Sequence, residues 1–116
     1  MEEVWHSIAS ESDFPEDGKL AVTLGGWSVL IVRTDDGFHA FNDRCTHQAA
    51  LLSSGRVRRG AIMCPLHGAR FDVATGQCIG GAYANLRTFP LRSEAGKLEV
   101  AVPAVPPGPQ ERPVAG

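Results

Sequence analysis

The sequence of 116 residues lacks any long hydrophobic run. No stretch approaches the roughly 18 apolar residues of a membrane-spanning helix. The first residues, MEEVWHSIAS, have no apolar segment of the kind that a secretory signal contains. We therefore expect a soluble cytoplasmic protein with no membrane partner, and the length is that of one domain.

The sequence also lacks a strong excess of charge of one sign. It carries 11 Lys and Arg against 13 Asp and Glu, which gives a net charge of −2, and its isoelectric point is about 6.0. Proteins that bind nucleic acid or anionic lipid usually carry an excess of positive charge. This balance predicts no nucleic-acid partner.

A clean 3.6-residue hydrophobic period is missing from every stretch of helix length. Short β-rich runs alternate instead with turn pairs such as Asp36-Gly37 and Thr75-Gly76. Such a pattern is typical of an antiparallel sandwich or barrel, so we predict an all-β fold. The strands are expected at residues 4–9, 19–24, 28–33, 38–42, 61–64, 69–73, 86–92 and 97–102, with one helical turn within 10–17.

The C-terminal stretch 103–116, PAVPPGPQERPVAG, holds five of the eight prolines. Proline lacks a backbone N–H, so this stretch cannot build a sheet or a helix. We expect a single domain over residues 1–102 and a flexible, Pro-rich tail over 103–116. Within the domain, residues of metal-binding type gather in a central block, about 43–82, which we interpret as a loop-rich subdomain on a β scaffold.

Cysteine and histidine are scarce, and their spacing is informative. The pattern is Cys45-x-His47, sixteen residues, then Cys64-x-x-His67. Two sulfur and two nitrogen ligands suit a zinc ion or an iron–sulfur cluster. A zinc finger usually groups its cysteines and then its histidines, whereas here each loop has one of each. That arrangement fits two metals side by side, with each loop giving its Cys to one and its His to the other.

The remaining chemistry-bearing residues have simpler interpretations. Cys78 has no second ligand near it in sequence, so we expect a small buried thiol. His6 and His39 are expected to be ordinary strand residues. The aromatic side chains of Phe38, Phe41, Phe71, Trp5 and Trp27 are expected in the core or in sheet packing.

A short basic run, Arg56, Arg58 and Arg59, lies beside the Cys and His residues of the central block, between the two pairs. Two interpretations stand: a docking patch for an acidic partner face, or a solvated strand edge. The solvated edge is the simpler of the two.

The central block resembles the Rieske [2Fe–2S] proteins, in which C-x-H and C-x-x-H loops hold the cluster. The run CPLHGARFDVATGQC, residues 64–78, is similar to the second cluster loop of that family and its following strand. The resemblance implies one [2Fe–2S] cluster. Cys45 and Cys64 would bind the inner iron as thiolates, and His47 and His67 would bind the outer iron through ring nitrogens.

The chain up to about Pro103 resembles the Rieske-type ferredoxins of bacterial aromatic-ring-hydroxylating dioxygenases. This likeness implies an electron carrier of aromatic hydrocarbon catabolism and not an enzyme. It would take single electrons from a flavin-dependent reductase and pass them to a terminal Rieske non-haem iron oxygenase. Such redox encounters are transient, and we expect a monomer.

The chain departs from the high-potential Rieske proteins at four positions. Their two loop disulfide cysteines correspond to Ala50 and Leu66 here, and their Ser and Tyr hydroxyls correspond to Ala69 and Phe71. Hydrogen bonds to sulfur stabilise the reduced cluster, so their loss implies a low potential.

Three glycine-containing segments are expected near the cluster. Gly55 and Gly68 would allow backbone N–H groups to approach the sulfides closely. A third loop, CIGGAYAN, lacks the proline that the family often has there, and Gly80, Gly81 and Ala82 are expected to cover the cluster instead.

The sequence can be compared with what three other functions require. An oxygenase needs a mononuclear iron site, typically two His and one carboxylate, for which only His6 and His39 would remain. A small Rieske subunit of another oxidoreductase, such as a nitrite reductase, is an alternative, although such subunits often lack the ligand set that is complete here. A zinc-stabilised binding module is the remaining alternative, and its lack of colour would distinguish it.

Overall fold

The computed structural model describes residues 2–46, 49–66 and 68–114, which form short strands and two single-turn 3-10 helices. None of the helices in this part of the chain has the length and apolar character needed to span a membrane. The elements are β1 (Glu3–Ser10), η1 (Glu11–Asp13), β2 (Lys19–Leu24), β3 (Trp27–Thr34), β4 (Gly37–Asn42), η2 (Leu52–Ser54), β5 (Arg56–Arg58), β6 (Ala61–Met63), β7 (Arg70–Asp72), β8 (Thr88–Phe89), β9 (Leu91–Glu94) and β10 (Lys97–Pro103).

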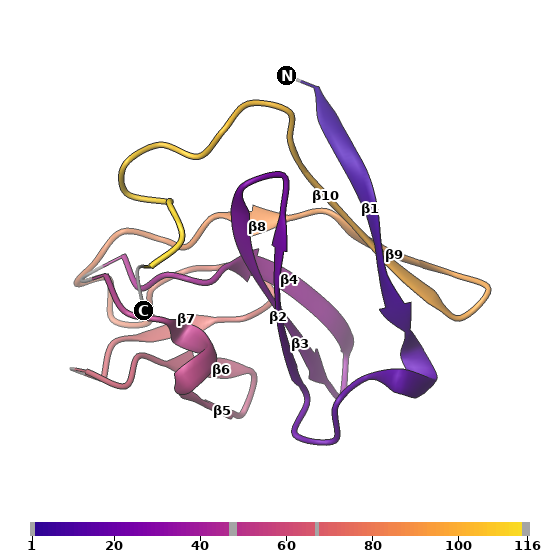
Figure 1. The fold of residues 1–116 in the computed structure, drawn as a ribbon. Coiled ribbons are helices and arrows are strands. Elements are labelled where there is room, and N and C mark those ends of the chain that lie inside the picture. Colours follow the sequence, from indigo (N-terminus) through magenta and orange to yellow (C-terminus); the bar gives the residue numbers. More distant parts are fainter. Residues whose placement is uncertain (1, 47–48, 67, 115–116) are drawn as a thin grey trace.

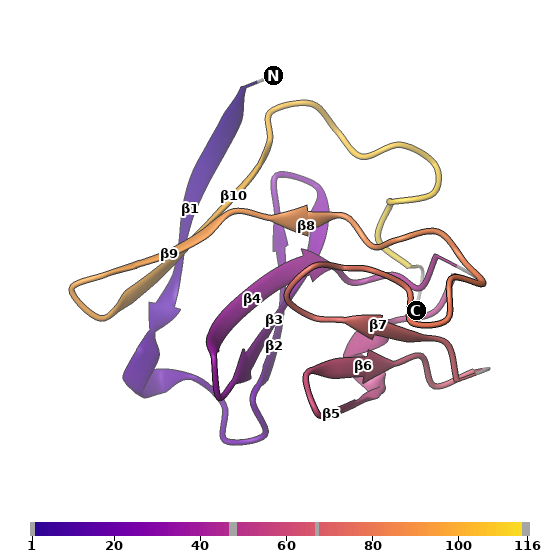
Figure 2. The same ribbon diagram turned by 180° about the vertical axis from the view of Figure 1, so that it is seen from behind.

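The strands form three antiparallel sheets with the orders β1-β10-β9, β2-β3-β4-β8 and β5-β6-β7. The four-stranded sheet lies in the middle of the molecule (Figure 1). The β5-β6-β7 sheet lies to one side of it and the β1-β10-β9 sheet to the other (Figure 2). The predicted all-β fold is confirmed.

Strand β3 connects two hydrophobic cores because its neighbouring residues face opposite sides of the sheet. Leu30 and Val32 pack in a cluster that also contains Cys45 and Cys64. Val29 and Ile31 pack on the other side, with residues of β4, β8 and β10. Every residue of β3 from 27 to 32 is buried, which explains its nearly continuous apolar sequence.

The predicted strands agree with the structure within one or two residues, with one exception. The single strand expected over 86–92 is two short strands, β8 and β9, which pair with β4 and β10 in different sheets. Pro90 separates them and has no N–H for a ladder hydrogen bond. Strand β5 and helix η2 were not predicted, because a three-residue element carries almost no periodic signal.

Most single residues lie where the sequence placed them. His6 and His39 are strand residues of β1 and β4. Trp27 is buried, but Trp5 is 39% exposed and so does not belong to the core. Its ring instead stacks with Arg92, whose guanidinium carbon lies 4.0 Å from the ring centroid.

The chain continues beyond β10 as an irregular segment that runs back past the four-stranded sheet (Figure 1). The indole Nε1 of Trp27 donates a hydrogen bond of 2.9 Å to the carbonyl of Val105. The amide of Asn42 donates one of 3.2 Å to the carbonyl of Glu111. The flexibility expected of residues 103–116, and the domain boundary at 102, stay predictions.

Candidate metal centre

Cys45 follows the end of β4 and begins the first of two similar loops. Its backbone N–H donates a hydrogen bond of 2.9 Å to the carbonyl of Ala50, five residues further along the chain. Ala50 is buried, with 8% of its surface exposed. This hydrogen bond closes the loop locally, so the position of Cys45 depends on the loop itself as well as on β4.

Cys64 follows the end of β6 and begins the second loop, which closes in the same way. Its N–H donates a hydrogen bond of 2.7 Å to the carbonyl of Ala69, also five residues further along. Gly68 returns an N–H to the carbonyl of Cys64 at 3.1 Å. Gly68 has a φ of 76°, in the left-handed region that favours glycine.

The two cysteines lie deep, whereas described residues further along each loop are exposed to solvent. Cys45 and Cys64 are each 2% exposed, and both belong to the same group of buried, mainly hydrophobic side chains. Thr46 and Leu66, which flank the loop tips, are exposed. His47 and His67 lie outside the described residues, so the structure does not place them and the four-ligand assignment stays a prediction.

The buried cysteines suit a metal cluster on chemical grounds. The thiolate is the form of cysteine that binds metal. Two thiolates in an apolar cluster would carry uncompensated buried charge, which is costly unless a cation balances it. Iron bound at both sulfurs would supply that compensation, so the donor set and its surroundings fit a [2Fe–2S] cluster.

Two residues that the sequence analysis did not single out hold the first loop in place. Asp43 is 1% exposed, and its carboxylate accepts a hydrogen bond of 2.8 Å from the N–H of Ser53. Lys19, on β2, donates from Nζ to the carbonyls of Ser53 and Gly55 at 2.9 and 2.6 Å. These partners are 10 to 36 residues apart, so no local pattern could have revealed them.

Gly55 ends the first loop at a point where its backbone nearly touches β6. A Cβ atom at this position would lie 1.9 Å from the carbonyl oxygen of Met63, the residue before Cys64. The φ of Gly55 is −88°, which any residue can adopt. The structure thus requires glycine here for space, and this close approach ties the first loop to the strand that carries the second.

The third loop forms one polar contact with the first loop and one within itself. The hydroxyl of Thr46 donates to the carbonyl of Ala84 at 2.6 Å. The N–H of Cys78 donates to the side-chain oxygen of Asn85 at 3.0 Å, and Cys78 itself is 2% exposed. Cys78 is therefore the small buried residue that we expected. Gly80 and Gly81 are exposed, and their expected covering of the cluster stays a prediction.

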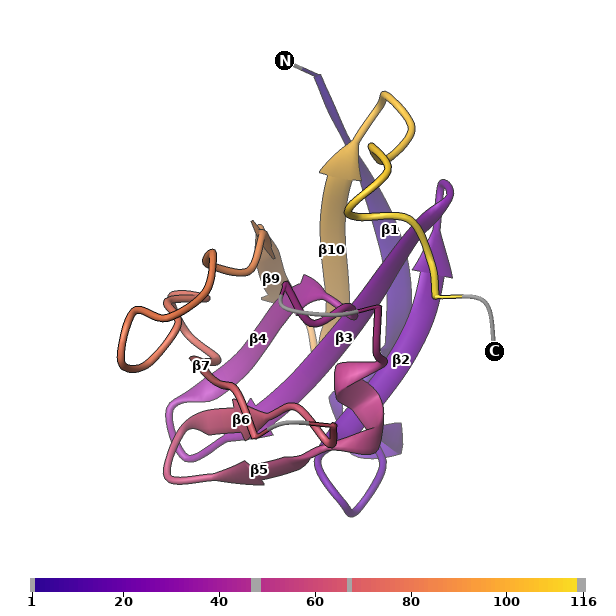
Figure 3. The ribbon, with the colours of Figure 1, turned by 90° about the vertical axis from the view of Figure 1, so that its left-hand side faces the viewer.

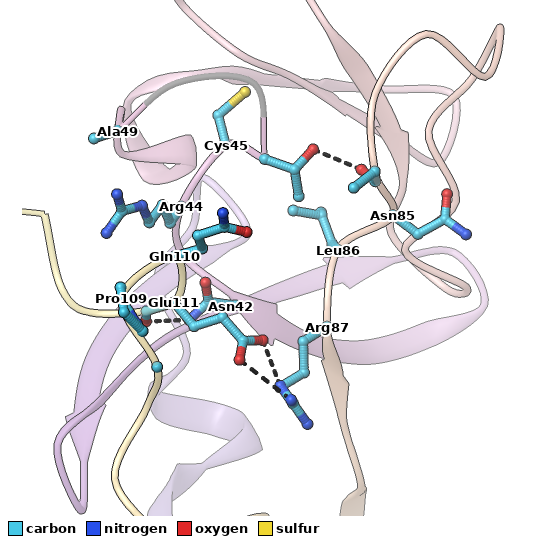
Figure 4. A pocket seen from close by; sticks show the side chains of 13 residues that line it. Asn42, Arg44, Cys45, Ala49, Asn85, Leu86, Arg87, Pro109, Gln110 and Glu111 are labelled. Carbon is cyan, nitrogen blue, oxygen red and sulfur yellow. Dashed lines mark hydrogen bonds and ion pairs between the residues drawn. The ribbon is translucent and has the colours of Figure 1, made fainter.

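A cleft separates the first loop from the C-terminal segment (Figure 4). Arg44 donates to the carbonyl of Arg112 at 3.0 Å. Arg87 binds Glu111 through two hydrogen bonds of 2.5 and 3.2 Å. The hydrogen bond to Glu111 raises the pKa of the Arg87 guanidinium above its ordinary value, against the opposing effect of burial.

Comparisons with known proteins agree with this site. The profile of the Rieske [2Fe-2S] domain matches residues 4–90. The chain is 32% identical over 101 residues to the ferredoxin component of the naphthalene 1,2-dioxygenase system of Pseudomonas aeruginosa, covering 86% of this chain and 97% of the relative.

Two solved structures have the same fold. A chain in the complex of reduced oxygenase and oxidised ferredoxin of carbazole 1,9a-dioxygenase matches with a TM-score of 0.78 and 30% identity, over 86% of this chain and 94% of that one. A structure described as an NADH-dependent nitrite reductase small subunit from Mycobacterium tuberculosis matches with a TM-score of 0.78 and 25% identity, over 90% and 100%. With its profile, fold and donor set in agreement, the chain belongs to the Rieske [2Fe-2S] domain family.

Proposed function

We propose that this protein is a one-electron carrier of a multicomponent oxygenase system and not an enzyme. It takes electrons from a flavin-dependent reductase and delivers them to a terminal Rieske non-haem iron oxygenase, which dihydroxylates an aromatic ring. The naphthalene dioxygenase relative is a ferredoxin component, and the carbazole dioxygenase structure is a complex of a ferredoxin with an oxygenase. Both support this role.

We assign Cys45 and Cys64 as the thiolate ligands and His47 and His67 as the imidazole ligands of the cluster. The observation that carries the assignment is the pair of loops, each closed by the same hydrogen bond, with a buried cysteine and an exposed residue next to the proposed histidine ligand. When bound, the cluster supplies a one-electron redox couple. The apolar side chains around the cysteines exclude water from the inner side of the site.

The surroundings of the site suit electron transfer because little has to move. Cys45 and Cys64 are held by loop hydrogen bonds and by a packed cluster that includes Phe41 and Phe71, both fully buried. Close-packed protein interiors resist deformation. Thr46 and Leu66, which lie next to the assigned histidines in the sequence, are exposed, so a partner could approach this side of the site, where the histidines would exchange electrons.

Replacing a proposed ligand tests the assignment. His67→Ala should lose the cluster or hold it unstably, because the outer iron would lose one of its two imidazoles. Iron and sulfide content, visible absorption and the EPR of the dithionite-reduced protein measure this. His39→Ala, in a half-buried position of β4, is the matched control and should keep the red-brown colour. Full cluster content in His67→Ala would refute the ligand set.

The reduction potential is expected near the bottom of the Rieske range, about −150 mV. Ala69 and Phe71 offer no side-chain hydroxyl to a cluster sulfur, and hydrogen bonds to sulfur are what stabilise the more negative, reduced state. A redox titration followed by absorption measures the potential. A clearly positive value would contradict the expectation.

The nitrite reductase small subunit is the second candidate, favoured by its structural match over nearly the whole chain. A subunit of that kind would copurify with a large partner, whereas a carrier would not. Size-exclusion chromatography of the holoprotein therefore separates the two functions and also tests the proposed monomer.

A colourless protein with stoichiometric zinc would instead indicate a structural module. Cell fractionation tests the proposed cytoplasmic location.

A further inference from the structure

Four arginines gather on one face of the β5-β6-β7 sheet. Arg56 and Arg58 are on β5, Arg59 is in the turn that follows, and Arg70 is on β7. Together with Met63 they line one shallow groove. We call these five residues the arginine face. The sheet lies at the edge of the molecule, away from β1 and β10 (Figure 3).

The strand register puts these side chains on a common face. Met63, in the middle strand, lies opposite Arg56 on one side and Arg70 on the other. Because side chains alternate between the faces of a strand, the next row of residues points inward. That row is Val57, Ile62 and Phe71, of which Ile62 and Phe71 are fully buried.

The positive charge of this face exceeds the negative charge on the same sheet, because four arginines face one carboxylate, that of Asp72, which the register places in one row with Arg58. In the described part of the chain, none of the four arginines has an ion pair or a side-chain hydrogen bond, whereas Arg87 and Arg92 each pair with a glutamate. Asp72 is the acidic residue on the same sheet, and its Oδ1 accepts the backbone N–H groups of Ala74 and Thr75.

The sequence shows the same local imbalance. Residues 44–71 contain five arginines and no Asp or Glu, although the whole chain has a net charge of −2. The face is also partly apolar, since Met63 is 37% exposed and the neighbouring Ile79 is 43% exposed. Arginine together with exposed methionine is typical of protein interfaces, whereas a merely solvated edge needs no apolar centre.

The arginine face continues onto the second cluster loop. Gly68, within that loop, also lines the groove. A Cβ atom built on Gly68 would lie 3.7 Å from the sulfur of Met63, and Met63 immediately precedes the buried Cys64. A partner that covers this face would therefore lie against the loop that carries a proposed ligand of the outer iron.

We propose that the arginine face is the docking surface for an acidic protein face on one of the redox partners. The inference rests on the proposed electron-carrier function. Complementary charge steers encounter and fixes orientation more than it adds affinity, which suits a carrier that must bind and leave quickly. At physiological ionic strength the Debye length is about 8–10 Å, so salt screens the attraction between charges that lie farther apart than this.

Ferricyanide, a small anionic oxidant, tests the face without an identified partner. The dithionite-reduced holoprotein gives one electron to ferricyanide, which becomes ferrocyanide, and stopped-flow absorption measures the rate. If the net charge of −2 governed encounter, added salt would speed the reaction. We expect salt to slow it instead, on the order of 10-fold between low and physiological ionic strength, because the local charge is positive.

Variants locate the effect. Arg56→Gln with Arg58→Gln should abolish the slowing by salt, while Arg33→Gln with Lys97→Gln, exposed residues of β3 and β10, removes the same charge and should preserve it. A rate that rises with salt in the wild type, or an unchanged slope in the first variant, would overturn the inference. Cluster content and potential, measured on the same samples, show separately whether the electron-carrier function stands.

Two polymers identify the kind of partner. Poly-L-glutamate at low ionic strength should compete with ferricyanide and slow oxidation of the wild type several-fold, about the range of electrostatic steering. It should have no such effect on the Arg56→Gln, Arg58→Gln variant. Duplex DNA that slowed the reaction at a lower charge concentration than poly-L-glutamate would assign the face to nucleic acid and overturn the proposal.

Discussion

Asp43 shows how single polar residues position the metal centre. It lies two residues before Cys45 and is 1% exposed, and its side-chain oxygen accepts a hydrogen bond from the N–H of Ser53. Its own N–H donates to the carbonyl of Ser28 on β3 at 2.9 Å. The residue thus fixes both ends of the first loop, at Cys45 and at η2, to the buried central strand.

Asp43→Ala should destabilise the protein by about 1–3 kcal/mol, because the N–H of Ser53 would be left without its acceptor. Asp43→Asn keeps an oxygen at the same position and is the matched control, with a smaller loss. Thermal unfolding of the holoprotein and the rate of iron release to a chelator measure the effect. Equal losses in the two variants would show that the charge, and not the hydrogen bond, holds the loop.

At the scale of elements, the two cluster loops are joined by the close approach of Gly55 to β6. A Cβ atom 1.9 Å from the carbonyl of Met63 cannot be accommodated without a shift of backbone. Since Met63 precedes Cys64, such a shift would displace the second loop relative to the first. The spacing between Cys45 and Cys64, the proposed sulfur ligands, therefore depends on a residue that is not itself a proposed ligand.

Gly55→Ala should lower stability by about 1–3 kcal/mol or more, as overpacking does, and should lower cluster content as well. Gly108→Ala is the control, because a Cβ atom there would have nothing within 4 Å. Iron content and the thermal midpoint of both variants are the measurements. A Gly55→Ala protein with full iron content and an unchanged midpoint would contradict this account of the loop junction.

At this scale, the sequence predicts features that depend on residues close together in the chain. The Cys/His pairs and most strands are such local patterns, so they could be predicted. The division of 86–92 at Pro90 carried a signal, since proline within a run argues against one continuous strand. The supports by Lys19 and Asp43 join residues far apart in the chain, and no local spacing encodes them. The assignment of His47 and His67 as ligands rests on the sequence alone.

For the whole molecule, the C-terminal segment connects parts that are distant in sequence. Trp27 and Val105 are 78 residues apart, and their hydrogen bond ties the C-terminal segment to β3 of the four-stranded sheet. Arg87 and Glu111 form an ion pair with side chains 44% and 28% exposed. Exposed pairs contribute about 0–1 kcal/mol, so the Trp27 contact is expected to matter more.

Removal of residues 104–116 should lower the thermal midpoint by several degrees, because the buried indole N–H of Trp27 would lose its acceptor at a cost of about 1–3 kcal/mol. Glu111→Gln, which removes only the ion pair, is the control and should have a smaller effect. A truncated protein with an unchanged midpoint would instead favour a domain that is complete at residue 102 and a tail that contributes nothing to it.

The burial of β3 between two cores has a consequence for the life of the protein in the cell. Leu30 and Val32 pack beside the cysteines, while Val29 and Ile31 of the same strand hold the opposite core together. Iron loss would loosen the first core, and the shared strand would pass that loosening to the second. Because local opening exposes a chain to proteases, the abundance of the protein would then follow the supply of iron.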